Sequence, residues 1–156
     1  MKKLFFTYFF ILTLILSGCT SAKIIQQTTI PQNKKNVYIS LDNTQANVNS
    51  VGFIAGNFFI AGTDSASFNT LDNRLIIKQE LISKGFSVTT KIKTADLILF
   101  GGCESSEVES VVTLVLSDSA TEEEYCILQG TYGMGMDLKG DIKGALKNAL
   151  KNLPMH

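Results

Sequence analysis

The chain lacks most of the side chains on which catalytic and metal sites are built. It has no tryptophan and a single histidine, His156, which is its last residue. Cysteine–histidine catalysis and histidine-rich metal sites need a histidine that is held beside a partner, and a terminal residue after Pro154 is expected to be mobile. We therefore predict that the protein is not an enzyme and that it binds no cofactor or metal.

The chain also has no excess of positive charge. Basic and acidic residues number 14 each, so the composition does not indicate nucleic acid as a partner. The carboxylates that do cluster, at Glu104, Glu107 and Glu109 and at 122–124, are typical of solvated turns rather than of acid–base sites. The glycine-rich stretch 130–140 lacks the spacing of a phosphate-binding loop.

A hydrophobic run opens the chain, and no later segment is long enough to span a membrane. Lys2 and Lys3 precede the run, which extends from Leu4 to Leu16. A membrane helix needs about 20 apolar residues, whereas the apolar part of a secretory signal needs about 7–15. The run therefore predicts a secretory signal.

The end of this signal, Leu16-Ser17-Gly18-Cys19, resembles the bacterial lipobox, in which a branched apolar residue and two small residues precede a cysteine. The resemblance implies diacylglycerol on the Cys19 thiol, cleavage between Gly18 and Cys19, and acylation of the new amino end by a fatty acid such as palmitate. A plain signal peptide with an incidental cysteine is the alternative. Thr20, where an aspartate favours the inner membrane, implies the outer membrane, with the domain facing the periplasm.

Cleavage after Gly18 would leave 138 residues, enough for one domain with one core. Loss of Lys2 and Lys3 leaves 12 basic residues against 14 acidic ones, a balance of −2. Residues 19–35 are polar and predict a tether, of which a short piece could pack as an edge strand. Residues 36–156 then form a single domain.

The periodicity of the domain predicts an α+β fold. Strands are expected at 37–41 and 86–90, at 95–103 as a strand buried on both faces, and at 108–118 and 125–133 as a meander. One helix is expected after Asn69 or Thr70 and before Gly85, with its apolar face at Leu71, Leu75 and Ile82. A second, amphipathic helix ends at Pro154. We predict an antiparallel or mixed sheet of about five to six strands, with both helices on one face.

The stretch 51–62, VGFIAGNFFIAG, is apolar and glycine-containing. A core strand or hairpin is one interpretation. The other is a loop that touches lipid or an integral partner, because exposed apolar patches usually mark contacts. For such a contact the residues we select are the following: Asn57, Phe58, Phe59, Ile60 and Ala61.

Cys103 and Cys126 remain once Cys19 is lipidated. An oxidising envelope permits a disulfide between them. Two buried free thiols are the alternative, because cysteine is often a small core residue.

The stretches KNVYISLDNT, ELISKGFSV and ADLIL resemble the early part of TraT-type complement-resistance lipoproteins, over residues 35–100. The chain does not have the long glycine-rich apolar insert of that family. The second half, with VTLVLSDSATEEEYCILQGTYG and a closing Ala/Leu/Lys helix, is similar to small outer-membrane lipoproteins of unassigned function. These resemblances imply a structural or interaction module with an envelope protein partner. A surface-exposed protective or exclusion lipoprotein, or a small-ligand or lipid-binding one, is the alternative.

Overall fold

The computed structural model describes residues 19–41, 45–54, 57–106, 109–133 and 138–156, and for Cys19, 45–54 and 57–65 it describes the backbone alone. Six strands form one mixed sheet in the order β1-β8-β7-β6-β2-β5, and β3 and β4 form a separate hairpin. The strands are β1 (Cys19–Gln27), β2 (Asn36–Leu41), β3 (Gln45–Ile54), β4 (Asn57–Ser67), β5 (Ser87–Thr89), β6 (Leu97–Ser105), β7 (Ser110–Asp118) and β8 (Glu124–Gly133). The helices are α2 (Leu71–Ser83), the short 3-10 helix η1 (Ile92–Thr94) and α3 (Leu138–Lys151).

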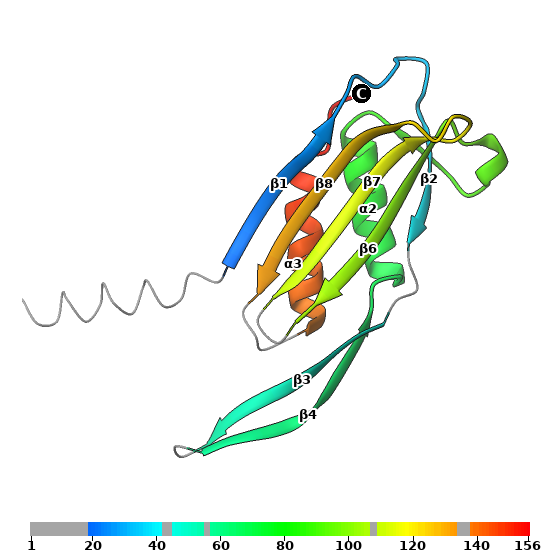
Figure 1. Ribbon diagram of the computed structural model, residues 1–156. Helices are drawn as coiled ribbons and strands as arrows, with labels where there is room; N and C mark the ends of the chain where they lie inside the picture. Colours follow the sequence, from blue (N-terminus) through cyan, green and yellow to red (C-terminus); the bar gives the residue numbers. More distant parts are fainter. Residues whose placement is uncertain (1–18, 42–44, 55–56, 107–108, 134–137) are drawn as a thin grey trace, which may run out of the picture.

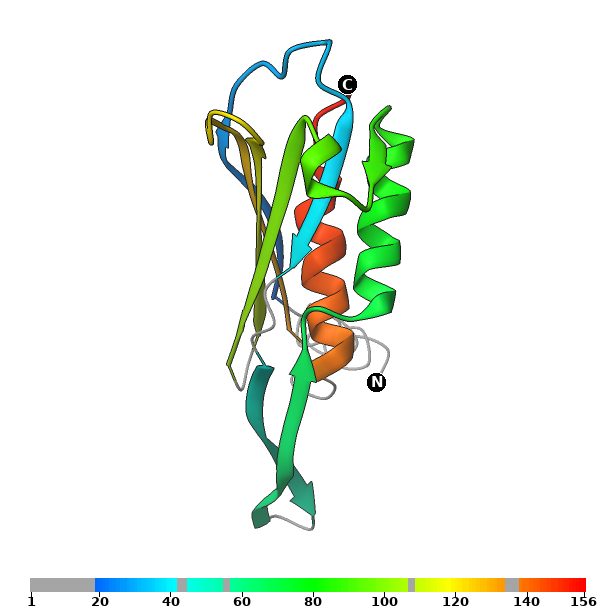
Figure 2. The same cartoon turned by 90° about the vertical axis from the view of Figure 1, so that its right-hand side faces the viewer.

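Both long helices lie on the same face of the six-stranded sheet, and the opposite face carries no layer among the described residues (Figures 1 and 2). β2 runs parallel to its neighbours β5 and β6, and the remaining pairs are antiparallel. The predicted α+β class, with a mixed sheet of this size and two helices on one face, is confirmed.

Helix α3 packs against the middle of the sheet through the apolar stripe that its sequence predicts. Ile142, Leu146 and Leu150 are at most 2 % exposed. An added Cβ on Gly130 of β8 would lie 2.1 Å from the Ala145 carbonyl oxygen and 2.2 Å from the Ala149 nitrogen. The helix backbone therefore rests directly on the strand at a position that only glycine allows.

Helix α2 begins and ends where the sequence predicts, but it buries a different face. The Asn73 amide donates to Thr70 Oγ1 (3.2 Å) at its start, and Gly85 has a positive φ of 95° just after its end. Its buried residues are Asn73, Ile77 and Leu81. The predicted apolar face, Leu71, Leu75 and Ile82, is exposed instead. The helix thus carries two apolar stripes, and the stripe that packs into the core is the one next to Arg74. The Arg74 guanidinium donates to the Ile39 carbonyl oxygen.

Strand β6 also differs from its prediction. Leu97 and Leu99 are fully buried under the helices, but Ile98 is half-buried and Phe100 is exposed on the other face. The continuous apolar run is therefore covered on one side only. The run resembles a strand buried on both faces because the side chains on the bare sheet face are apolar here too.

The predicted tether is largely folded. Residues 19–27 form edge strand β1, antiparallel to β8. The segment that follows is tied down as well, because the Thr28 amide donates to the Tyr125 carbonyl oxygen (2.7 Å) and Lys34 forms an ion pair with Asp118. Polar composition predicted a tether because the side chains of residues 20–27 are exposed to solvent. The order of this segment comes from pairing with a distant strand of the chain.

Candidate functional site

Cys19 is the first residue of β1, and its Cα lies opposite Gly133 at the end of β8. Gly18 and the rest of the predicted signal lie outside the described residues. The attachment point predicted from the sequence therefore adjoins the sheet directly, with no linker between them.

The uncovered side of the six-stranded sheet, called here the outer sheet face, carries apolar side chains that water reaches. Phe100 is 46 % exposed, and Ile98, Val115 and Ile127 of the same face are half-buried. Val115 lies opposite Phe100, and Ile127 lies opposite Val115 on the next strand. Two shallow hollows, of about 420 and 360 Å³, both include Phe100 and Val115 in their walls. Exposed apolar surface of this kind usually marks a contact site.

A second exposed apolar surface belongs to α2, a helix that lies on the opposite side of the sheet from the outer sheet face (Figure 2). This α2 stripe consists of Leu71, Leu75 and Ile82, which are 72 %, 45 % and 54 % exposed. They recur at intervals of four and seven, so they form one line along the helix. Sequence reasoning missed both surfaces, because it assigned each apolar run to the core. The signal that could have found them is that α2 and β6 carry more apolar positions than one buried face needs.

The residues selected for partner contact, 57–61, lie on β4 in the half of the hairpin nearest its tip. Phe58 lies opposite Phe53, Phe59 opposite Gly52 and Ile60 opposite Val51. The hairpin interpretation of this stretch agrees with the backbone. The hairpin extends beyond the sheet and is not one of its strands (Figure 1).

Cys103 and Cys126 are free, so the disulfide that the sequence permitted is absent. Cys103 is on β6 and Cys126 on β8, with β7 between them; their partners on β7 are Val112 and Leu116. Two strand spacings amount to roughly 9.5 Å, beyond the limit of about 7 Å for a disulfide. Sequence spacing could not reveal the intervening strand.

Neither thiol is activated as a nucleophile. Burial raises the pKa of the Cys126 thiol to about 11. Burial also raises the pKa of the Cys103 thiol; a hydrogen bond with Ser105 opposes this rise, and the nearby Glu104 carboxylate adds to it. A raised pKa leaves little thiolate at neutral pH.

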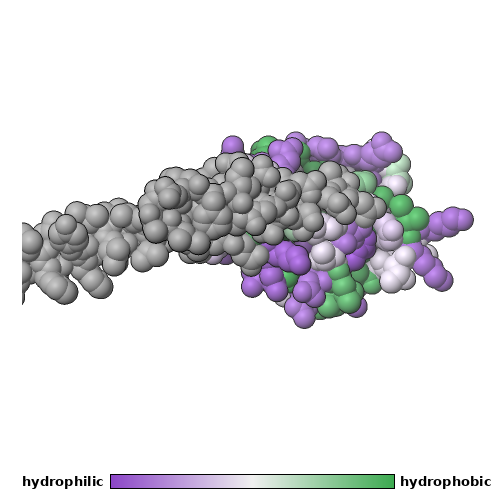
Figure 3. Space-filling view, turned by 90° about the horizontal axis from the view of Figure 1, so that it is seen from below, coloured by the Kyte–Doolittle hydropathy of each residue, from purple (hydrophilic) through white to green (hydrophobic). Residues whose placement is uncertain are grey.

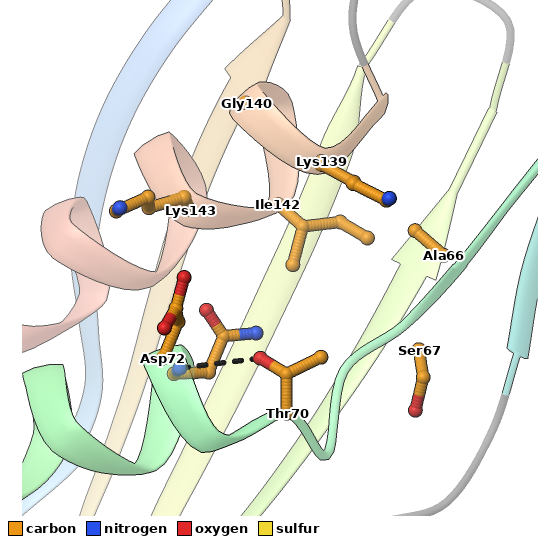
Figure 4. A pocket seen from close by; sticks show the side chains of 9 residues that line it. Ala66, Ser67, Thr70, Asp72, Lys139, Gly140, Ile142 and Lys143 are labelled. Atoms are coloured by element: carbon orange, nitrogen blue, oxygen red, sulfur yellow. Dashed lines mark hydrogen bonds between the residues drawn. The ribbon is translucent and has the colours of Figure 1, made fainter.

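A hollow of about 430 Å³ lies where α2 and α3 begin (Figure 4). Lys139 and Lys143 of α3 and Asp72 of α2 line it, so its charges are mixed. The hydroxyl of Thr70 caps α2, and the Asn73 side chain donates to the Phe68 carbonyl oxygen (2.9 Å). These two hydrogen bonds hold the start of the helix, which indicates a structural role for the polar groups that make them.

His156 is docked, contrary to the expectation that it is mobile. Its backbone amide donates to the Lys84 carbonyl oxygen (2.8 Å), and its ring meets the Phe86 ring edge-on at 5.0 Å. His156 contacts Lys84 and Phe86 because the end of α2 lies beside residue 156. The local sequence does not encode this proximity.

Within the described part of the chain, no group of three histidine, cysteine or acidic residues is arranged to hold a metal ion. Glu107 lies outside the described residues, while Glu104 and 122–124 are exposed. None of the described helices is long and apolar enough to cross a membrane. The statement that the chain is not an enzyme stays a prediction.

These features define the fold as an α+β domain with a mixed, open-faced sheet, two helices on one side and a projecting hairpin. Solved structures that share it include the PelC dodecamer from Paraburkholderia phytofirmans and the dodecamer of a point-substituted PelC from the same organism. The substituted form is 12 % identical to this chain with a TM-score of 0.53, and the other is 13 % identical with a TM-score of 0.52. Each match covers 88 % of this chain and 100 % of the other. At this identity the likeness concerns the fold. No family model and no curated protein matches the chain.

Proposed function

We propose that this chain is a membrane-anchored bacterial lipoprotein that acts as a structural or interaction module of the cell envelope. The observation that carries the proposal is the Leu16-Ser17-Gly18-Cys19 motif placed directly before a folded domain. Cleavage after Gly18 would make Cys19 both the lipid carrier and the first residue of β1.

The anchor is effective on physical grounds. Each buried methylene contributes about 0.8 kcal/mol, so several acyl chains on one cysteine hold a protein nearly permanently. Because β1 begins at Cys19, the domain would stay within a few residues of the headgroups instead of ranging on a linker. Thr20 favours the outer membrane, and the domain would then face the periplasm.

Replacing Cys19 by alanine is expected to abolish incorporation of labelled palmitate and to block processing after Gly18. Cys103→Ala is the matched control, since it removes another cysteine and leaves the motif intact. The measurements are fatty-acid labelling and the mass of the amino-terminal peptide. Labelling of the Cys19→Ala protein, or an unlabelled wild type, would contradict the proposal.

Self-association is the second candidate for how such a module works. The outer sheet face and the α2 stripe are both exposed and apolar, and α2 lies on the opposite side of the sheet from the outer sheet face (Figure 2). A contact in which one copy's sheet face receives the next copy's α2 stripe is heterologous, and heterologous contacts close into rings when the rotation permits. The two PelC structures of similar fold are both dodecamers, which favours this arrangement.

If self-association holds, Phe100→Ser and Leu71→Ser should each shift the purified lipidated protein from an oligomer to a monomer. Loss of a central apolar anchor typically costs about 2 kcal/mol or more, roughly 30-fold in affinity. Ile92→Ser is the matched control, because Ile92 is 53 % exposed but lies on neither surface. Light scattering in detergent measures the mass; a wild-type monomer at every concentration would exclude the assembly.

A further inference from the structure

The β3–β4 hairpin is divided into two halves of different chemistry. In its base half, residues 45–50 of β3 lie opposite 62–67 of β4, and most of these residues are polar. In its distal half, residues 51–54 lie opposite 57–60. The distal half contains three phenylalanines, two isoleucines and a valine, and it contains no charged residue.

The hairpin leaves the body at the same end as the predicted lipid site. In Figures 1 and 2, β1 starts at the end from which β3 and β4 project, and the chain terminus marked C lies at the opposite end. The register agrees, because Cys19 lies opposite the last residue of β8. In Figure 3, which views the molecule from this end, the coloured side chains around the grey atoms are both hydrophilic and hydrophobic.

We propose that the distal half of the hairpin is a second membrane contact, seated in the leaflet that holds the acyl chains of Cys19. This inference rests on the proposed function, because the lipid on Cys19 is what turns this end toward a bilayer. It also assigns a partner, a lipid surface, to the contact residues 57–61.

The dimensions favour a shallow insertion. A strand rises about 3.3 Å per residue, so four to five distal residues reach roughly 15 Å, about half of a hydrocarbon core of about 30 Å. A two-stranded hairpin also leaves its outer backbone groups unpaired, and hydrocarbon does not satisfy them. The distal half therefore fits the headgroup–acyl boundary of one leaflet.

The charge pattern favours lipid over a protein partner. Asp64, in the base half, is the one charged residue of the sequence between Gln45 and Ser67. Protein interfaces draw orientation and specificity from charged and polar groups, whereas insertion among acyl chains requires their absence. The polar base half would then span the region between the headgroups and the domain.

The test uses the absence of tryptophan from the chain. Phe58→Trp places a single fluorophore in the distal half, and Ile92→Trp is the matched control in η1 at the other end. Each protein is purified from membranes in its processed form and reconstituted into vesicles of phosphatidylethanolamine and phosphatidylglycerol that contain brominated lipid. Circular dichroism and thermal midpoints check that both variants fold like the wild type.

We expect the emission of Phe58→Trp to shift to the blue and to be quenched by brominated lipid, and the emission of Ile92→Trp to do neither. No lipid quenching of Phe58→Trp, or equal quenching of both variants, would overturn the inference. The mass of the amino-terminal peptide is a separate readout. Lipidated Cys19 without quenching would overturn the hairpin contact alone, whereas quenching without lipid on Cys19 would support the contact and reject the anchor.

Discussion

Replacing Gly130 by alanine is expected to destabilise the domain by about 3 kcal/mol or more, at the upper end of what overpacking costs. The new Cβ would stand 2.1 Å from the Ala145 carbonyl oxygen and 2.2 Å from the Ala149 nitrogen. Both are backbone atoms of α3, so no side-chain rotation relieves the clash. The helix has to move off the sheet, and Leu146 and the rest of its buried stripe move with it.

Both sides of the contact between α3 and β8 lack room for an added side chain. A Cβ on Gly144 of α3 would lie 2.4 Å from the Tyr132 ring of β8. Gly130 of β8 thus faces α3, and Gly144 of α3 faces β8. The two backbones therefore lie closer together than side chains at these positions would allow. This contact fixes where α3 lies along β8.

Gly102→Ala is the matched control. Gly102 is in β6 of the same sheet, and an added Cβ there would meet nothing within 4 Å. Its effect should stay within about 0.5 kcal/mol or be slightly stabilising, because alanine loses less backbone entropy in a strand. Urea unfolding of both variants measures the difference. Equal free energies of unfolding would show that α3 does not rest on Gly130 as described.

The sequence predicted the helices whose first and last residues are set by neighbouring residues of the chain. Helix α3 has a complete apolar stripe and a proline stop, and α2 has Thr70 at its start and Gly85 at its end. The α+β class followed from the order of these elements. Their boundaries could be predicted because caps, stops and periodicity act within a few residues of one another.

Contacts between distant parts of the chain could not be predicted in the same way. The order of β1 depends on β8, the separation of Cys103 from Cys126 depends on β7 lying between them, and the docking of His156 depends on the end of α2. The choice of buried face on α2 is similar. Two apolar stripes compete, and the position of the sheet decides between them.

The candidate surfaces differ in the same way: some can be selected from a local sequence pattern, and others depend on how distant elements pack. Cys19 and residues 57–61 could be selected as candidates because a short motif and a run of phenylalanines are visible in the sequence itself. The outer sheet face was missed because an apolar strand looks the same in sequence whether one face or two are covered. Only the placement of both helices on one side reveals that Phe100 meets solvent.

Replacing Asp118 by alanine is the second change with a large expected effect, a loss of about 3 kcal/mol. The Asp118 side chain is 1 % exposed and forms an ion pair with Lys34. It also accepts hydrogen bonds from the Tyr125 hydroxyl (3.1 Å) and from the amides of Ala120 (2.8 Å) and Thr121 (3.1 Å). One carboxylate therefore closes the β7–β8 turn and fastens the segment between β1 and β2.

Its removal leaves the buried Tyr125 hydroxyl without its acceptor and the half-buried Lys34 without its counter-charge, and an unsatisfied buried group costs about 1–3 kcal/mol. Thermal unfolding should show a midpoint lower by about 10 °C for a domain of this size. Asp118→Asn keeps acceptor capacity without the charge and should fall between alanine and wild type. Asp72→Ala, which removes an exposed carboxylate from the first turn of α2, should change stability by about 0.5 kcal/mol. If Asp118→Ala unfolded no earlier than Asp72→Ala, the β7–β8 turn would be held by its backbone hydrogen bonds alone. The segment between β1 and β2 would then be held by the pairing of β1 with β8.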